Sequence, residues 1–198
     1  MEFVLGLKCN DFVLLACDKK KCRGIMCQKD DVDKMYKVGS NQLLAIVGQN
    51  SDDVQFAEFI QRNMAYLAFS NGFEPSTSAI ANFSRQTLAN SIRSQGIYQA
   101  NMFIGGWDEG KGTSLYFLDY LGSLISVPFG CHGYGSYFAL SILDRFYNPN
   151  LEISEAVKLL WMIVRDIEKR FIVNLPKFLV RIVDKNGITV IEEELTLR

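Results

Sequence analysis

The sequence predicts an α+β fold in which antiparallel sheets are covered by helices. Short strand patterns and helical patterns come in separate groups along the chain, an order typical of antiparallel sheets rather than of βαβ units. The 198 residues are 48% hydrophobic and 22% charged, as in an ordinary globular protein. Because a chain of this length forms one substantial core, we expect a single domain over residues 1–198.

Each strand is predicted by a short run rich in Val, Ile, Leu or aromatic residues and bounded by turn residues. The first two strands should form an antiparallel hairpin, and the three strands between residues 98 and 129 should form a meander. Asn186 and Gly187 are a strong signal for a closing hairpin. The expected strands are 3–8, 11–17, 35–38, 42–47, 98–105, 114–119, 123–129, 178–184 and 188–192.

Each helix is predicted by apolar residues that recur at helical spacing. Ser51 or Asp52 is placed as the N-cap of the first helix and Ser154 as that of the last, because short polar side chains accept hydrogen bonds from free amide groups. Gly72 is expected to end the first helix. The expected helices lie between residues 51 and 72, 75 and 96, 135 and 146, and 154 and 171.

The charge balance argues against several classes of partner. Twenty-one Lys and Arg against 22 Asp and Glu give a net charge of −1, which provides no general attraction for nucleic acid or an anionic membrane. The uncharged runs are much shorter than the ~20 apolar residues that cross a bilayer, and residues 1–4 do not resemble a secretory signal. We therefore expect no nucleic acid partner, no membrane span, and a cytoplasmic or nuclear location.

Five cysteines and one histidine are the residues most able to carry nucleophilic or metal chemistry; they are Cys9, Cys17, Cys22, Cys27, Cys131 and His132. An odd number of cysteines among apolar neighbours favours reduced, mostly buried thiols. Cys131 and His132 are adjacent, and neighbours usually point in different directions, so we expect no catalytic thiol–imidazole pair. Cys22 and Cys27 lack the further ligands that a structural zinc needs. The sequence predicts no metal and no cofactor.

Two further motifs are interpreted structurally. The basic run from Lys19 to Arg23 could contact an acidic partner, although a solvated loop is the favoured interpretation. Gly130, Gly133 and Gly135 indicate a strand-to-helix turn, since no Gly-Lys-Ser/Thr follows to make a phosphate loop. Residue chemistry alone identifies no intact active site.

Several ordered runs resemble the 20S proteasome beta subunits over the full chain. The opening runs are Gly6-Leu7-Lys8, Val13 to Asp18, Gly24, Asp33-Lys34-Met35 and Val47-Gly48. Later runs are similar to the beta type 2 group of that family, at ring position four: Asp53 to Gln61, Gly105 to Asp108, Leu118 to Gly122, His132 to Gly135 and Ile182 to Ile188. The resemblance implies a four-layer αββα sandwich of N-terminal-nucleophile hydrolase type, with two antiparallel sheets between helical layers.

Active members of this family use an N-terminal threonine, whose hydroxyl attacks the peptide carbonyl while its own amine accepts the proton. The resemblance places Glu2 at that position, with only Met1 before it and no propeptide expected. Asp18 and Lys34 match the family's buried aspartate and lysine, and Gly48 matches the glycine whose N–H stabilises the oxyanion. The family's later supporting positions are lost, because they correspond to Tyr134, Asn174 and Lys177.

The resemblance therefore implies a non-catalytic structural beta subunit in which Asp18 and Lys34 form a structural ion pair. Its implied partners are the other beta subunits of a heteroheptameric ring, the alpha-ring subunits and the opposite beta ring. Its implied work is ring assembly and walling the chamber in which sibling threonine proteases degrade proteins. Two alternatives stay open: a processed N-terminal-nucleophile amidohydrolase that starts at Cys9 or Cys22, and a free-standing binding module.

Overall fold

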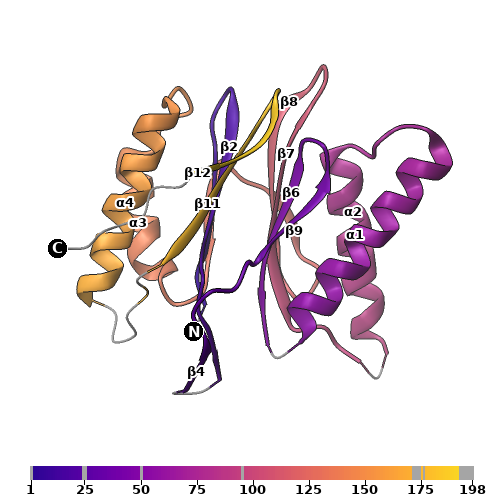
Figure 1. The fold of residues 1–198 in the computed structure, drawn as a ribbon, viewed down its shortest axis with the longest axis horizontal. Coiled ribbons are helices and arrows are strands. Elements are labelled where there is room, and N and C mark those ends of the chain that lie inside the picture. Colours follow the sequence, from indigo (N-terminus) through magenta and orange to yellow (C-terminus); the bar gives the residue numbers. More distant parts are fainter. Residues whose placement is uncertain are drawn as a thin grey trace.

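Two five-stranded sheets pack face to face, and a pair of helices covers the outer face of each (Figure 1). This computed structural model describes residues 2–23, 26–49, 51–94, 96–170, 175 and 177–191. All the strand pairs in both sheets are antiparallel. The expected four-layer α+β sandwich is confirmed.

The first sheet joins strands from the start, the middle and the end of the chain. Its order is β10-β1-β2-β11-β12, so β1 lies inside the sheet between β2 and β10. β1 and β2 form the expected first hairpin. β11 and β12 form the expected closing hairpin, in which Gly187, with a φ of 119°, begins β12. The strands are β1 (Val4–Lys8), β2 (Phe12–Asp18), β10 (Phe129–His132), β11 (Phe178–Asp184) and β12 (Gly187–Ile191). Residue 192, expected to end the last strand, lies outside the described residues.

The second sheet has the order β5-β6-β7-β8-β9 and contains the expected meander. A single strand over residues 123–129 was wrong, since β9 ends at Ser126 and Phe129 begins β10 in the other sheet. Pro128 lies at the crossing, where it has no N–H to donate to a strand ladder. The strands are β5 (Met35–Gly39), β6 (Gln42–Gly48), β7 (Ala100–Asp108), β8 (Gly112–Leu118) and β9 (Leu124–Ser126).

The helices are α1 (Asp52–Asn71) and α2 (Thr77–Ile92) over the second sheet, and α3 (Ser136–Phe146) and α4 (Ile153–Arg170) over the first. Gly72 ends α1 as expected, with a φ of 76°. Ser154 is not a cap, because α4 already begins at Ile153. Its first turn is closed instead by the Glu155 carboxylate, which accepts the N–H of Glu152 at 3.1 Å. None of these described helices is long and apolar enough to cross a membrane.

A small two-stranded hairpin, β3 (Lys21–Arg23) and β4 (Met26–Lys29), projects beyond the end of the sandwich (Figure 1). The expected solvated loop over this basic run was wrong. Lys19 pairs with Asp31, and the side chain of Lys21 is only 17% exposed and contacts two carboxylates. The ammonium groups of Lys19 and Lys21 are therefore already paired with carboxylates of the chain itself, which leaves less positive charge for an external acidic partner.

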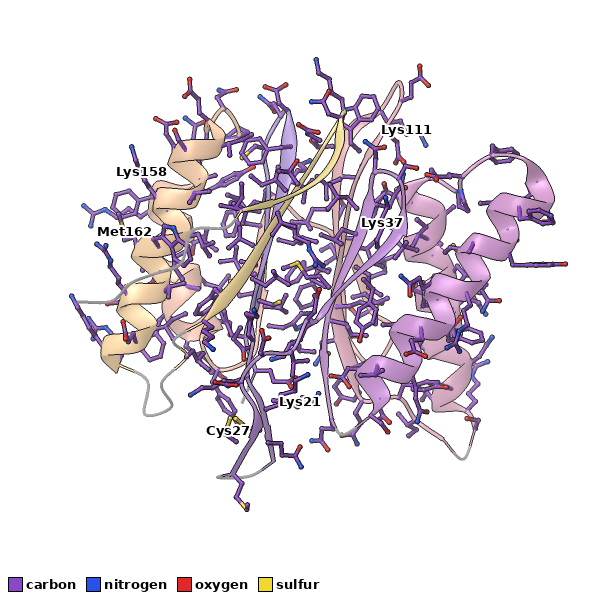
Figure 2. All side chains as sticks on the ribbon, viewed as in Figure 1. Lys21, Cys27, Lys37, Lys111, Lys158 and Met162 are labelled. Carbon is purple, nitrogen blue, oxygen red and sulfur yellow. The ribbon has the colours of Figure 1, made fainter. Side chains whose placement is uncertain are left out.

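Apolar side chains fill all three spaces between the four layers (Figure 2). Strand β2 shows how both faces of a strand are used. Val13 and Leu15 point into the space between the sheets, whereas Leu14 points toward α3 and α4. Successive residues of a strand face opposite sides. Because β2 is buried on both faces, it is hydrophobic at every position from Phe12 to Cys17.

Candidate functional site

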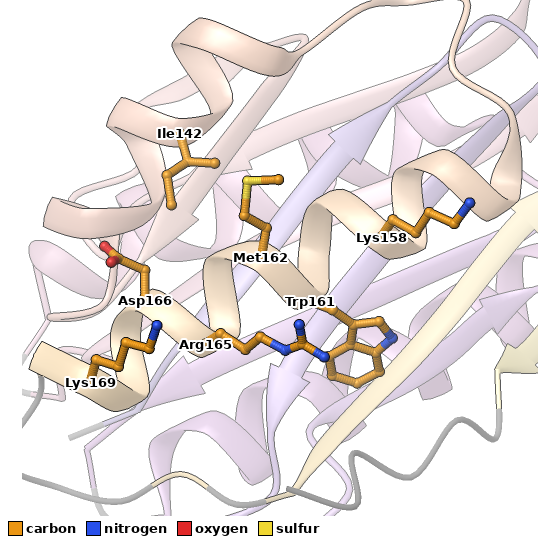
Figure 3. A pocket seen from close by; sticks show the side chains of 7 residues that line it. All are labelled: Ile142, Lys158, Trp161, Met162, Arg165, Asp166 and Lys169. Carbon is orange, nitrogen blue, oxygen red and sulfur yellow. The ribbon is translucent and has the colours of Figure 1, made fainter. Parts of the chain in front are cut away.

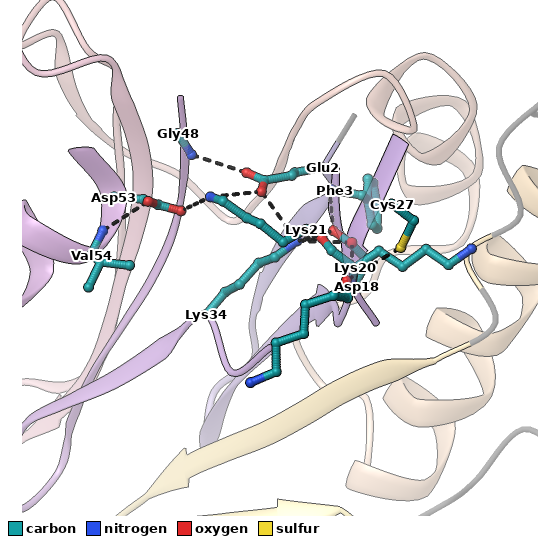
Figure 4. A network of polar contacts seen from close by, with 11 residues as sticks. Glu2, Phe3, Asp18, Lys20, Lys21, Cys27, Lys34, Gly48, Asp53 and Val54 are labelled. Atoms are coloured by element: carbon teal, nitrogen blue, oxygen red, sulfur yellow. Dashed lines mark hydrogen bonds and ion pairs between the residues drawn. The ribbon is translucent and has the colours of Figure 1, made fainter. Parts of the chain in front are cut away.

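A network of charged side chains lies where the ends of several elements meet near the start of the chain (Figure 4). Glu2 precedes β1, Asp18 ends β2, Lys21 begins β3, Lys34 precedes β5, and Asp53 lies in the first turn of α1. Segments from the first quarter of the chain thus converge on one end of the sandwich. The resemblance had singled out three of these five residues.

The most buried part of the network is the pair of Asp18 and Lys34, whose side chains are 0% and 2% exposed. Lys34 Nζ lies 3.0 Å from Asp18 Oδ1 and 2.9 Å from Oδ2, and it donates to the carbonyl of Lys20 at 2.6 Å. Asp18 also accepts the N–H groups of Phe3 at 2.7 Å and Lys20 at 3.0 Å. Both charges are therefore compensated by partners inside the protein, as a buried ion pair requires.

The Glu2 carboxylate is anchored by both of its oxygens. Oε1 lies 3.0 Å from the Nζ of Lys21 and 3.7 Å from that of Lys34, and Oε2 accepts the N–H of Gly48 at 3.2 Å. The side chain is 10% exposed. The resemblance assigns the Gly48 N–H to the family's oxyanion. In this chain, that donor is engaged by a carboxylate of the chain itself.

Lys21 and Asp53 complete the network and were missed by the sequence reasoning. The ammonium group of Lys21 bridges the carboxylates of Glu2 and Asp53. Burial lowers the pKa of Lys21, but the hydrogen bonds and charges of Asp53 and Glu2 outweigh it, so that the pKa is raised. In the sequence, Lys21 was hidden in a run of cations, and Asp53 looked like an ordinary acid in the first turn of a helix.

Two of the positions that correspond to lost family residues, Tyr134 and Lys177, lie in the described part of the chain. Tyr134 is exposed at the turn before α3. The preceding Gly133 has a φ of 92° and approaches the Glu2 carbonyl so closely that a side chain would overlap it. Lys177 is exposed and lies 3.6 Å from a carboxylate oxygen of Asp30. Asn174 lies outside the described residues.

Cys131 and His132 face opposite sides of β10, as expected for neighbours in a strand. Cys131 packs beneath α3 and α4, where burial raises its pKa. The His132 ring lies between the sheets, stacked on Phe117 at a centroid distance of 4.0 Å and tilted against Phe103 at 5.2 Å. Burial lowers the pKa of His132 to about 4, with Asp119 acting in the opposite direction. The structure does not bring this thiol and imidazole together.

A groove of about 590 Å³ lies on the outer side of α3 and α4 and is separate from the network (Figure 3). It is lined by Ile142, Lys158, Trp161, Met162, Arg165, Asp166 and Lys169. Three cations and one carboxylate surround an apolar floor, and the carboxylate is held by Arg170 at 3.0 Å. The lining contains no thiol, hydroxyl or imidazole. Within the described part of the chain, no group of three or more His, Cys, Asp or Glu residues could hold a metal.

Comparison with known proteins identifies the family. The family described as "Proteasome subunit" matches residues 2–183. The chain belongs to the proteasome subunit family. Its relatives include beta subunits that match over nearly the full chain: "Proteasome subunit beta type-4" of Saccharomyces cerevisiae is 39% identical over 194 residues, which cover 98% of each chain. "Proteasome subunit beta type-2-A" of Arabidopsis thaliana is 39% identical over 187 residues, covering 94% of this chain and 91% of the relative.

A third relative, "Proteasome subunit beta type-2" of Dictyostelium discoideum, is 39% identical over 194 residues, covering 96% of this chain and 97% of the relative. The predicted resemblance to proteasome beta subunits is thereby confirmed. In this beta subunit, the contacts of the network are made by carboxylates, ammonium groups and main-chain groups. Such an arrangement compensates charge and fixes the start of β1 against β2, β6 and α1.

Proposed function

We propose that this beta subunit is a non-catalytic, structural member of the 20S proteasome core particle. The placement of the Glu2 carboxylate carries the proposal. The family chemistry needs a hydroxyl that attacks a peptide carbonyl and an N–H that receives the developing oxyanion. Glu2 has no hydroxyl, and its Oε2 already accepts the Gly48 N–H at 3.2 Å.

The surroundings of Glu2 also argue against nucleophilic attack by the carboxylate. Its two oxygens are engaged by Lys21 and Gly48, which withdraw electron density from the lone pairs that an attack would use. Attack on an amide would form an anhydride, which is a more reactive acyl group than the amide itself. The network is therefore suited to fixing the N-terminal strand, and Asp18 and Lys34 act as a structural ion pair.

The exposed apolar side chains support an assembly role. Both outer helical layers carry large hydrophobic residues at the surface, and where such side chains form a contiguous patch they mark an interaction surface. On α3 and α4 they include Tyr137, Leu140, Phe146, Ile153 and Met162, and at the end of α1 they include Tyr66, Phe69 and Phe73. Burial against neighbours would remove these side chains from water.

The proposed partners are the other beta subunits of a heteroheptameric ring, the alpha-ring subunits and the opposite beta ring. The chain would act as one beta-subunit domain that walls the chamber in which sibling subunits degrade proteins, in the cytoplasm and the nucleus. A ring of unlike subunits needs interfaces that exclude the wrong neighbour. Charges left unpaired and shapes that do not fit provide this exclusion, because both make the wrong contact unfavourable. The cationic groove beside α3 and α4 offers such a charge pattern.

The sheet topology argues against a processed enzyme that starts at an internal cysteine. A new N-terminus at Cys9 would remove β1, which pairs with both β2 and β10. A new N-terminus at Cys22 would remove β1 and β2, two neighbouring strands of the first sheet. Either loss opens two of the three apolar clusters, the one beneath α3 and α4 and the one between the sheets. The cost is far above the ~0.5–3 kcal/mol of an ordinary substitution.

The test is the native mass of the chain purified gently from its own cells, with the co-purifying chains identified by mass spectrometry. We expect a particle far larger than 22.4 kDa that contains other beta and alpha subunits. A lone soluble monomer would favour the binding module instead. The same particle is then treated with an electrophile that reacts with N-terminal threonine. The sibling subunits should be labelled and this chain should not, whereas covalent labelling of this chain would contradict its non-catalytic role.

A further inference from the structure

Two thiols face each other across the β3–β4 hairpin. Cys22 and Cys27 are cross-strand partners, and Arg23 and Met26 form the next pair. Directly opposed residues of antiparallel strands share a face, with Cα atoms about 4.5 or 5.5 Å apart. Both separations lie within the range of roughly 4.4–6.8 Å that a disulfide spans. Both thiols are free in this structure, and the strand register makes the two residues direct partners.

These two cysteines also differ from the other three in their exposure. Cys27 is exposed and Cys22 is half-buried, on a hairpin that projects from the sandwich (Figure 2). The other three, Cys9, Cys17 and Cys131, are buried in the apolar clusters. Burial raises the pKa of Cys9 to about 11 and that of Cys17 to about 12. Thiol chemistry from solution is thus directed to the hairpin.

We propose that Cys22 and Cys27 form a reversible dithiol–disulfide modification site whose co-reactant is a small soluble disulfide of the glutathione type. The Cys27 thiolate attacks one sulfur of the small disulfide, forms a mixed disulfide and releases one thiolate, which takes up a proton. The Cys22 thiolate then attacks the Cys27 sulfur and displaces the second small thiol. Two protein thiols are oxidised by two electrons, and one small disulfide is reduced to two thiols.

The environment of each thiol sets this order of attack. Cys27 reaches solvent, so a bulky disulfide meets it first. The pKa of Cys22 is raised by burial and by the charge and hydrogen bond of Cys27, while Lys20 lowers it. Conversion of Cys27 to a mixed disulfide removes the two contributions of that thiol to the raised pKa of Cys22, so the resolving attack becomes easier, although the contribution of burial stays.

The bridge would act on the segment that holds Glu2. Lys21 precedes Cys22 in the same strand and bridges Glu2 and Asp53. A covalent link from Cys22 to β4 restrains that strand and therefore the ammonium group that anchors the N-terminal carboxylate. In the dithiol form, β3 is restrained only by the backbone pairing of the hairpin.

The test equilibrates the full chain, in the particle from which it is purified, with reduced and oxidised glutathione at a series of ratios. Acid stops the exchange, and the free thiols are then blocked with excess maleimide at neutral pH under denaturing conditions before the chain is digested with trypsin. Trypsin cuts after Arg23, between the two cysteines, so a bridged chain gives a linked peptide pair. We expect this pair to exceed the glutathione adduct of Cys27 by about tenfold or more, because the second thiol is held close by. Dithiothreitol should remove it.

Two matched variants separate the roles of the thiols. Cys22→Ser should trap the glutathione adduct on Cys27, and Cys27→Ser should give neither the linked pair nor a strong adduct. Cys9, Cys17 and Cys131 serve as internal controls that react only after denaturation. The proposal is overturned if the wild-type chain accumulates the Cys27 adduct without the linked pair. It is equally overturned if both hairpin thiols stay reduced at every glutathione ratio.

Discussion

The charged network at the start of the chain and the imidazole of His132 are both buried, yet the network keeps its charges paired whereas burial favours the neutral form of the imidazole. In the network, Asp18 and Lys34 stay paired with 0% and 2% of their side chains exposed. His132 lies between the sheets against two phenylalanine rings, and its Nε2 has no hydrogen-bond partner among the described residues. Its pKa falls to about 4, so the ring is neutral at pH 7.

The difference follows from the partners that each site provides. A buried charge is retained where an opposite charge and several hydrogen bonds replace water, and it is lost where the remaining partners compensate too little of the lost hydration. The network provides Lys34 with a carboxylate and a carbonyl. The imidazole is stacked on an aromatic ring, and burial outweighs the backbone hydrogen bonds of Met102 and Leu118 that favour its charged form. Burial alone therefore does not decide the charge of a group in this fold.

The largest effect should come from removing one partner of the buried pair. Lys34→Met leaves the Asp18 carboxylate without its main counter-charge and should cost about 3–5 kcal/mol in the free energy of unfolding, measured by urea denaturation. The double variant Lys34→Met/Asp18→Asn should recover part of that loss, because no buried charge is left unpaired. If the double variant loses the full sum of both single changes, the pairing argument is wrong.

The second effect concerns the pH dependence of stability. Between pH about 6.5 and 4, the unfolded chain binds a proton on His132 that the folded chain does not bind, so stability decreases as the pH falls through this window. The total contribution is about 3 kcal/mol. Unfolding of the wild-type chain and of His132→Gln should therefore diverge below pH about 6.5. Parallel pH profiles for the two proteins would show that the ring is not neutralised by folding.

A smaller effect is expected at the edge of the network, where the side chains are slightly more exposed than those of Asp18 and Lys34. Lys21→Met leaves Glu2 and Asp53 without their shared cation and should cost about 1–2 kcal/mol, less than a fully buried pair. Because the pKa of Lys21 is raised by folding, its contribution is complete below pH about 10 and is lost as the pH rises through the raised value. Lys37→Met, on the exposed side of β5, is the control and should change stability by less than about 0.5 kcal/mol.

The smallest effect tests the one charge that favours protonation of His132. Asp119 raises the pKa of that ring against the effect of burial, so Asp119→Asn should lower it further by less than about one unit. The chain has one histidine, so a single imidazole signal reports the titration by nuclear magnetic resonance. An unchanged midpoint would mean that the Asp119 charge does not contribute to the pKa of His132.

Most elements could be predicted from the sequence, because periodicity and turn residues act locally. Gly72 and Asn186-Gly187 marked their boundaries, and the starts of β1, β2, β5 and β6 were placed within about one residue. The split between β9 and β10 was missed, since the change of sheet depends on which strand pairs with the residues that follow Pro128. That strand is β1. Local patterns contain no information about a partner that lies 124 residues away, such as Gly6 opposite Gly130.

The site was predicted only in part, for the same reason. Asp18, Lys34 and Gly48 were reached through the resemblance, and none of them has a distinctive local pattern. Lys21 and Asp53 gain their role from a contact across 32 residues, which neither the basic run nor the helix start reveals. The position of Glu2 beside the Gly48 N–H likewise depends on the fold that joins the ends of β1 and β6.

The strand order of the two sheets has a consequence for the time course of folding. In the second sheet, every strand pairs with its successor in the chain, so that sheet can grow as the polypeptide leaves the ribosome. In the first sheet, β1 must wait for β10, and β2 must wait for β11. The hydrophobic β1–β2 hairpin is synthesised first, but its outer neighbours β10 and β11 are synthesised much later. During synthesis it is therefore the segment most in need of protection from aggregation.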